Sequence, residues 1–316
     1  MRPMALLILA LLIAAGLLCG PQWLNPLQLT AFQQQLIVDL RLPRVLFAAL
    51  IGAMLGLSGS IYQLTLKNPL ADSFTTGAAS SSALGAVVAI AVGVNGYWVS
   101  LCAFVAGLFG LLSVYHMAQD RGQINPVTMI LAGVVMNIVA SAVISFTKYF
   151  YEDSLTAIVY WLMGGIFMVS WDRLAVCALV LSLSAFYFHR RSTALNLLAL
   201  DEASAQSLGV NVHRLRTLAF VLSTLLVSIA VSFAGIIGFV GLIVPHVARS
   251  LFGSDMKHNL FYSTVMGAGL LVIADGASRS IIPGGAELPV GILTALVGGS
   301  FFFYLLKTRR RSLWNG

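Results

Sequence analysis

Residues 41–72 read RLPR, then VLFAALIGAMLGLSGSIYQLTL, then KNPLAD. The central run, 45–66, holds 22 residues without a charge. At about 1.5 Å per residue, a helix of that length crosses a bilayer core of about 30 Å. Pro43 suits a first helical turn, where a missing N–H costs nothing, and Pro69 ends the helix because the residue before a proline avoids the α region. The stretch therefore predicts a membrane-spanning helix with two arginines at one mouth.

Small residues recur along this predicted span. Gly52, Gly56 and Ser60 are four residues apart, so they share one face of the helix. Small residues let the backbone of a second helix approach closely in a membrane. The pattern predicts a tight helix–helix contact on that face.

Composition sets the class of protein. Of 316 residues, 59% are hydrophobic and 9% are charged, and the mean hydropathy is +0.93. Soluble domains carry about 25% charged residues, so this chain cannot cover itself with a hydrated surface. We interpret residues 1–316 as one polytopic membrane domain. Cys19, Cys102 and Cys177 all lie in apolar runs, which predicts small hydrophobic side chains in the bilayer, with no disulfide and no metal site.

Hydrophobic runs predict an all-α membrane protein of about ten spans. They lie near 4–20, 45–66, 74–94, 97–117, 127–150, 157–188, 217–240, 242–252, 260–278 and 289–307. The run at 157–188 is interrupted by Trp171-Asp-Arg173, which indicates a short piece followed by a span. The run at 242–252 is too short to cross alone, and glycines before it indicate a helix interrupted within the membrane.

The basic residues predict an orientation with both termini in the cytoplasm. Thirteen fall inside under that arrangement: Arg2, Lys67, Arg121, Arg190, Arg191, Arg214, Arg216, Arg249, Lys257, Lys307, Arg309, Arg310 and Arg311. Five fall outside: Arg41, Arg44, Lys148, Arg173 and Arg279. This bias agrees with the positive-inside rule, so the net charge of +7 gives no reason to expect nucleic-acid binding.

The segment 189–216 is the one long polar insertion. Its apolar residues can line one face of a short helix, with two acids on the other side and a glycine at its C-terminal end. The apolar residues are Leu197, Leu200, Ala203 and Leu208; the acids are Asp201 and Glu202; the glycine is Gly209. A surface helix that docks onto a cytoplasmic partner fits this pattern, and a helix lying at the membrane interface is the alternative.

Five blocks of sequence, taken together and in order, resemble the FecCD family. They are Arg41-Leu-Pro-Arg44, Asn68-Pro-Leu-Ala-Asp72, Leu208-Gly-Val210, Gly238-Phe-Val-Gly-Leu-Ile-Val-Pro-His-Val-Ala-Arg249 and Glu287-Leu-Pro-Val-Gly-Ile-Leu-Thr294. Members are permease subunits of ATP-binding-cassette (ABC) importers for iron-siderophores, haem and cobalamin. The resemblance implies a type II ABC importer permease fold of ten helices in a bacterial inner membrane. It also implies a homodimer with the path on its two-fold axis, two copies of a separate ATPase and an external binding protein.

The resemblance also implies roles for particular residues. Arginines matching Arg41, Arg44 and Arg279 pair with glutamates of the binding protein in cobalamin-importing relatives. The stretch 198–212 matches the helices that couple to the ATPase, which assigns that role to Leu200, Asp201, Glu202, Ala203, Leu208, Gly209 and Val210. The cytoplasmic gate of the relatives has small hydroxyl residues where this chain has Asn125 and Pro126. The gate is therefore expected in the same place with different chemistry.

The chain carries no ATPase motif of its own. A P-loop needs Gly-Lys-Ser/Thr, and none of the four lysines follows a glycine. ATP and Mg²⁺ are therefore expected on the partner ATPase, and we assign this chain no cofactor, metal site or catalytic residue. A membrane-embedded enzyme fits poorly because the five histidines show no metal-ligand spacing.

An ion-coupled secondary transporter is the alternative, because such proteins place ionisable residues at mid-membrane. Nearly all acids here lie at span ends. Asp275 falls within a predicted span, and we interpret it as the structural partner of Arg279, four residues later. The residues do not rank iron-siderophore, haem and cobalamin as cargo. The outer aromatics Tyr149, Phe150, Tyr151 and Trp161 fit interfacial anchors better than ligand contacts.

Overall fold

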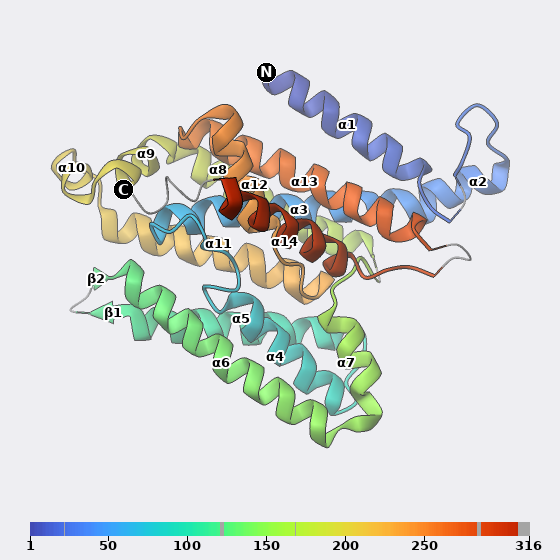
Figure 1. The fold of residues 1–316 in the computed structure, drawn as a ribbon, viewed down its shortest axis with the longest axis horizontal. Coiled ribbons are helices and arrows are strands. Elements are labelled where there is room, and N and C mark those ends of the chain that lie inside the picture. The colour runs from blue at the N-terminus through green and yellow to red at the C-terminus, as the bar shows by residue number, and fades with distance from the viewer. Residues whose placement is uncertain (22, 121–122, 168, 283–285, 309–316) are drawn as a thin grey trace.

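In a computed structural model of the protein, described over residues 1–21, 23–120, 123–167, 169–282 and 286–308, helices run roughly along the long axis (Figure 1). Arg121 and Arg309 to Arg311, used above for the orientation, lie outside these ranges. The elements are α1 Arg2–Leu18, α2 Ala31–Leu36, the π-helical turn η1 Ile37–Arg41, α3 Leu42–Thr65, α4 Ala78–Ala91, α5 Tyr97–Ala118, β1 Gln119–Asp120, β2 Gln123–Ile124, α6 Pro126–Phe150, the 3₁₀ turn η2 Glu152–Ser154, α7 Leu155–Leu162, α8 Trp171–Arg190, α9 Ser192–Leu200, α10 Glu202–Ser207, α11 Val212–Ala234, α12 Val240–Phe252, α13 Met256–Ser280 and α14 Val290–Thr308.

The described helices fit a multi-pass membrane protein. Six helical stretches in these ranges are long and apolar enough to cross a bilayer: Ala31–Thr65, α5, α6, α8, α11 and α13. Four shorter apolar helices accompany them: α1, α4, α12 and Val290–Leu305 of α14. The helical class is confirmed, while the count of ten spans stays a prediction. A two-residue antiparallel pair, β1 with β2, joins α5 to α6.

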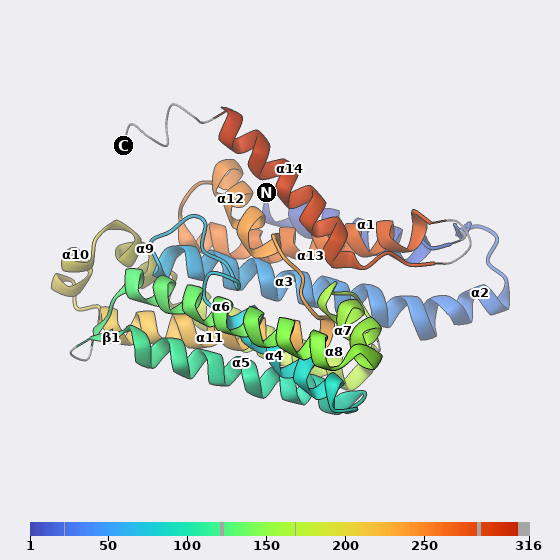
Figure 2. The same ribbon diagram turned by 60° about the horizontal axis from the view of Figure 1, so that its bottom comes forward.

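The long helix that ends in α3 is the centre of the packing. Its most apolar window is 89% buried inside the chain, whereas that of α6 is 22% buried. Both views show α13 running alongside α3 (Figures 1 and 2). A Cβ on Gly52 would collide with the carbonyl of Gly267, and one on Gly56 with the carbonyl of Ser263. The predicted close contact is confirmed at these two glycines.

This central helix begins earlier than the sequence interpretation placed it. Thr30 and Gln33 form a reciprocal capping box, and helical structure continues from Ala31 to Thr65. Pro43 therefore lies inside a continuous helix, not in its first turn. The π-helical turn η1 ends directly before α3. Proline has no backbone N–H to donate, and the changed hydrogen-bond pattern of a π-helical turn lets the helix continue past it.

Two interruptions agree with the sequence. A non-helical stretch separates α7 from α8, as expected for a short piece followed by a span, but it lies before Trp171-Asp-Arg173, which form the first turn of α8. The other lies between α11 and α12, where Gly235 (φ +67°) and Phe239 (φ +68°) both have left-handed φ values. A non-glycine residue rarely adopts such a φ value, so this break is a built feature of the fold.

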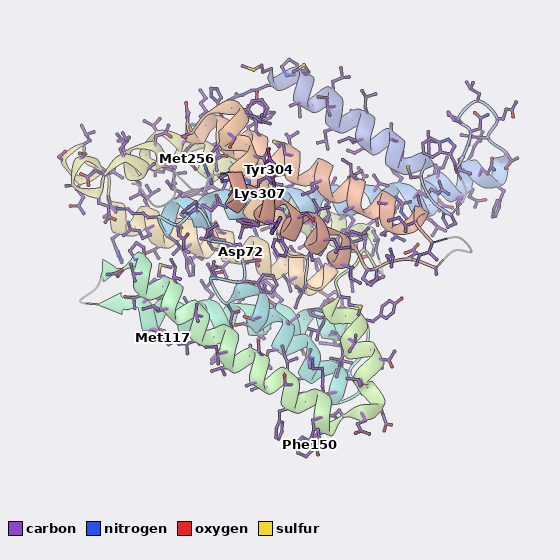
Figure 3. The ribbon with its side chains drawn as sticks, in the orientation of Figure 1. Asp72, Met117, Phe150, Met256, Tyr304 and Lys307 are labelled. Carbon is purple, nitrogen blue, oxygen red and sulfur yellow. The ribbon has the colours of Figure 1, made fainter. Side chains whose placement is uncertain are left out.

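The segment between α3 and α4 is ordered. Asp72, 7% exposed, lies in the interior of the helical bundle (Figure 3). Its carboxylate accepts hydrogen bonds from the backbone N–H groups of Phe74 and Thr75, both at 3.0 Å. The chain thus leaves α3 at Lys67 (φ +49°) and turns inward through a hydrogen-bonded loop.

Candidate functional site

One end of the bundle carries a cluster of ion pairs around Arg44. Its Nε lies 3.0 Å from Oδ1 of Asp275, and its two terminal nitrogens lie 2.9 and 2.8 Å from the oxygens of Glu287. The second contact is a two-pronged guanidinium–carboxylate pair, the strongest common geometry for such ions. Arg44 thereby ties α3 both to α13 and to the segment before α14.

Two further arginines of this cluster hold the C-terminal end of α1. Arg41 donates to the carbonyls of Leu17 and Leu18 at 3.0 and 2.9 Å. Arg279 donates to the carbonyls of Cys19 and Gly16 at 3.0 and 3.2 Å. The last carbonyls of a helix lack partners within it and carry partial negative charge. The two guanidinium groups satisfy both needs.

These contacts bear on the expected docking role of the arginines. Arg41 is 8% exposed and Arg279 is 3% exposed, so their charges are used inside the chain. Arg44 is more open, with 18% of its side chain exposed. It lines a cleft of about 510 Å³ together with Asp39, Glu287 and the two other arginines. Docking of a binding protein at the three arginines stays a prediction, and the geometry favours Arg44 as the one that meets a partner directly.

Asp275 is fully buried in α13. Its Oδ1 meets Arg44, and its Oδ2 lies 2.9 Å from Nη2 of Arg279, four residues later. The predicted structural pairing with Arg279 is confirmed. Both carboxylate oxygens of Asp275 are thus engaged by arginines of the chain itself, so this site gives the secondary-transporter alternative no support.

The opposite end of the bundle carries α9 and α10. Asp201 caps α10 by accepting a hydrogen bond from the Ser204 N–H at 2.9 Å. Glu202, the first residue of α10, contacts Arg216 of α11 at 2.6 Å and Lys67 at 2.8 Å. The hydrogen bond from Arg216 and the contact with Lys67 lower the pKa of Glu202 below its ordinary value of 4.5. Glu202 thus joins α10 to the ends of both α3 and α11.

The expected single helical face in this segment is wrong. The helix breaks at Asp201, whose extended backbone separates α9 from α10. Leu200 and Leu208 are 82% and 66% exposed, and Ala203 is exposed as well. The buried residues are instead Leu195, Leu198 and Ala205. Gly209 follows α10 with φ +82°, in agreement with its predicted position at a helix end. Val210 packs against the core.

The predicted gate residues begin α6. Asn125 is exposed, and its side chain accepts a hydrogen bond from the Val127 N–H at 2.9 Å. Pro126 takes the first helical position, where its missing N–H costs nothing. The geometry shows a capped helix start at this point, and a gating role for the pair stays a prediction.

Comparison with known proteins places this arrangement in a family. A model of the FecCD transport family matches residues 4–308. The vitamin B12 import system permease BtuC of Vibrio parahaemolyticus is 36% identical over 310 residues, covering 95% of this chain and 91% of that protein. The molybdate import system permease MolB of Haemophilus influenzae is 35% identical, covering 92% and 86%. A Helicobacter pylori protein named as an iron chelatin transport system permease is 37% identical, covering 87% and 83%.

Solved structures agree with these matches. An inward-facing structure of a metal-chelate type ABC transporter superposes with a TM-score of 0.89 at 34% identity, covering 97% of this chain and 98% of that one. PsaBC from Streptococcus pneumoniae, solved with a Fab, superposes with a TM-score of 0.60 at 19% identity, covering 87% and 94%. The second likeness shows a common fold alone.

Proposed function

The chain belongs to the FecCD transport family. From that membership we propose that it is one of the two permease subunits of a homodimeric, ATP-driven importer. Two copies of a cytoplasmic ATPase bind the end that carries α10, and an external binding protein delivers cargo to the end that carries Arg44. The dimer sits in a bacterial inner membrane with both termini in the cytoplasm. Cargo passes along the two-fold axis by alternating access, and ATP with Mg²⁺ stays on the partner ATPase.

The observation that carries this proposal is the exposure of Leu200 and Leu208 beside an anchored α10. Leu200 and Leu208 are 82% and 66% exposed on a segment outside the apolar spans, and a partner protein that bound this segment would cover both. Glu202 fixes the same segment to Lys67 and Arg216. A displacement of α10 is therefore transmitted through these ion pairs to the ends of α3 and α11. In this way closure of the ATPases moves the membrane helices.

We propose a metal chelate as the cargo, with an iron-siderophore first and haem or cobalamin next. The support is the FecCD membership and the superposition on a metal-chelate type transporter. Relatives named for vitamin B12 and iron chelatin point the same way. Asn125 and Pro126 would serve as the inner gate. Arg44 would contact the binding protein, while Arg41 and Arg279 hold the helix ends that present it.

The test is reconstitution in liposomes with the candidate ATPase and binding protein. We expect ATP hydrolysis to rise with the loaded binding protein. The double variant Leu200→Asp/Leu208→Asp should lose that rise by about tenfold or more, as at other protein–protein hot spots. Leu251→Asp is the matched control, because Leu251 is 65% exposed but lies on α12. Uptake that follows a proton or sodium gradient without any ATPase would overturn the proposal.

A further inference from the structure

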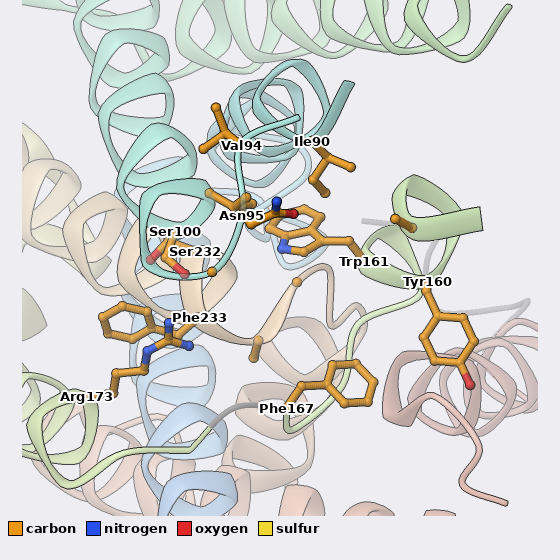
Figure 4. Close-up of a pocket in the computed structure, with 15 residues that line it drawn as sticks. Ile90, Val94, Asn95, Ser100, Tyr160, Trp161, Phe167, Arg173, Ser232 and Phe233 are labelled. Atoms are coloured by element: carbon orange, nitrogen blue, oxygen red, sulfur yellow. The ribbon is translucent and has the colours of Figure 1, made fainter. Parts of the chain in front are cut away.

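A separate cavity of about 260 Å³ lies beside α7, where α5 and α8 begin and α4 and α11 end (Figure 4). Its polar wall holds Arg173, Ser100 and Ser232, and Asn95 lies across from them (Figure 4). Trp161 and Phe167 supply aromatic surface. No acidic residue is among the described residues that line it.

Arg173 is the unusual member of this wall. It is 8% exposed, and its guanidinium lies 5.2 Å from the centre of the Phe233 ring. Within the described residues, this guanidinium makes no ion pair and donates no hydrogen bond. Arg41, Arg216 and Arg279 are similarly buried, and each donates to a carbonyl or a carboxylate of the chain. Among the described residues, Arg173 is thus the one of these four whose guanidinium has no acceptor within the chain.

The position of Arg173 at the start of α8 further destabilises its buried positive charge. Arg173 lies in the first turn of α8, where the helix dipole is positive and repels a cation. A buried cation normally requires a paired anion or hydrogen-bond acceptors. The neighbouring aromatic ring offers a weaker interaction than either. An anion in the cavity removes the repulsion and also gains from the positive end of α8.

The cavity holds further donors for such an anion. The hydroxyl of Ser100, 7% exposed, has no described partner and faces the same space as the guanidinium (Figure 4). The Asn95 amide donates one N–H to the Gly93 carbonyl at 3.2 Å and keeps a second. Ser232 donates its hydroxyl hydrogen to the Ile229 carbonyl at 2.9 Å, so it is not a donor to a ligand. A guanidinium fork with flanking donors matches a carboxylate or a phosphate.

We propose that this cavity is an anion site, in which Arg173 and Ser100 bind a carboxylate or phosphate group and Trp161 and Phe167 cover its carbon-bearing part. The volume is below the roughly 300–1,000 Å³ of drug-sized sites, so it takes a small anion or one anionic group of a larger molecule. Tyr97 and Trp98, 64% and 63% exposed beside the cavity, are of the types that sit at lipid headgroup level. The group therefore comes from a lipid headgroup or from a dissolved anion.

The test needs only the purified permease in detergent, so it does not depend on the ATPase or on the proposed import function. Sodium phosphate, sodium citrate and dioctanoyl phosphatidylglycerol are titrated, and the thermal midpoint is followed. Arg173→Gln removes the charge, Arg173→Lys removes the fork and Ser100→Ala removes the second donor. Arg190→Gln is the matched control, because Arg190 lies on the same helix, is exposed, and stacks on Phe186 at 5.0 Å.

We expect a saturable rise of the midpoint in the wild type and in Arg190→Gln. Arg173→Gln should weaken binding by about tenfold or more, the usual cost of losing a hydrogen bond to a charged group. Arg173→Lys and Ser100→Ala should weaken it by smaller factors. Without an anion, Arg173→Gln should melt above the wild type, because it removes an unpaired buried charge.

Native mass spectrometry separates the two sources. Phosphatidylglycerol retained by the wild type and lost from Arg173→Gln identifies a lipid headgroup, whereas binding of phosphate or citrate with equal lipid retention identifies a dissolved anion. Equal titrations and equal lipid retention in the wild type and Arg173→Gln would overturn the proposal. If Arg173→Gln does not fold, Arg173→Lys and Ser100→Ala decide, and wild-type binding in both overturns it.

Discussion

At the scale of single residues, the carboxylate of Asp275 is shared between two arginines of different helices. Replacing Asp275 with Asn leaves Arg44 with only Glu287 and leaves Arg279 without its acid. Removing one partner from a buried ion pair costs about 3–5 kcal/mol. We expect Asp275→Asn to lower the thermal midpoint of the purified protein strongly, as measured by unfolding followed by size-exclusion chromatography.

Asp172→Asn is the control for this change, because Asp172 is exposed in the first turn of α8. It should melt close to the wild type. A midpoint for Asp275→Asn that equals that of Asp172→Asn would show that the two arginines do not depend on the shared carboxylate.

The sequence predicted one half of this cluster and missed the other. Asp275 and Arg279 are four residues apart on one helix, and that spacing alone predicts their contact. Arg44 and Glu287 are separated by 243 residues, and no local pattern joins them. The capping of α1 by Arg41 was missed for the same reason. The basic character of these positions was visible in the sequence, but their burial depends on how distant helices meet.

At the scale of elements, the contact between α3 and α13 leaves no room for side chains at its glycines. Gly52→Ala would place a methyl group against the carbonyl of Gly267. Overpacking of this kind costs about 1–3 kcal/mol. We expect a lower thermal midpoint and a lower yield of folded protein.

Gly276→Ala is the matched control on α13. A Cβ there meets only Cys19, at an ordinary 3.7 Å, and alanine favours a helix over glycine. This variant should be neutral or slightly stabilising. Equal loss of stability in both variants would place the cause outside the contact of α3 with α13.

The link through Glu202 predicts a dependence on pH. Its lowered pKa means that the contacts with Arg216 and Lys67 are complete above the ordinary glutamate range and are lost as the pH falls through the lower folded value. A nitroxide at Ser207→Cys in a cysteine-free chain should be immobile near neutral pH and become mobile only at acid pH below the ordinary glutamate range.

Glu202→Gln should make the same label mobile at every pH. The effect on global stability should be smaller than that of Asp275→Asn, because Glu202 is 33% exposed whereas Asp275 is fully buried. A label that stays immobile in Glu202→Gln would mean that the cap at Asp201 and the packing of Ala205 hold α10 without the ion pairs.

Element boundaries show where sequence reasoning stopped short. Thr30 and Gln33 have the spacing of a capping box, so the early start of the central helix was detectable. Asp201 followed by Ser204 is also a helix-start signal, and it explains why one expected helix is two. Both signals lie in segments that an analysis of hydrophobicity does not detect. The break before α12 was predictable from its glycines. The break before α8 was predicted from charges that in fact lie in the first turn of α8.

At the scale of the whole molecule, the proposed assembly predicts a defined stoichiometry. Native mass spectrometry of the complex with its ATPase should find two permease chains of 33.7 kDa and two ATPase chains. Permease alone in mild detergent should also be a dimer. An active complex with a single permease chain would contradict the proposed two-fold path.

The overall class was predictable because it rests on sums over many residues. A charged fraction of 9% and a mean hydropathy of +0.93 exclude a soluble surface whatever the details of packing. The anion cavity around Arg173 was not predictable. In the sequence, Arg173 is only one more basic residue at a span end. Its lack of an acidic partner depends on how five helices pack around the cavity.

The burial of α3 has a consequence for how the protein is made. Gly267 leaves the ribosome 215 residues after Gly52. At about 5–20 residues per second, that delay is roughly 10–40 s. Throughout it, Gly52 on α3 lacks the backbone that later packs against it, and Arg44 lacks both of its acids. The nascent chain therefore depends on shelter by the insertion machinery until α13 arrives, and a chain cut short before α13 exposes that part of α3 to membrane proteases.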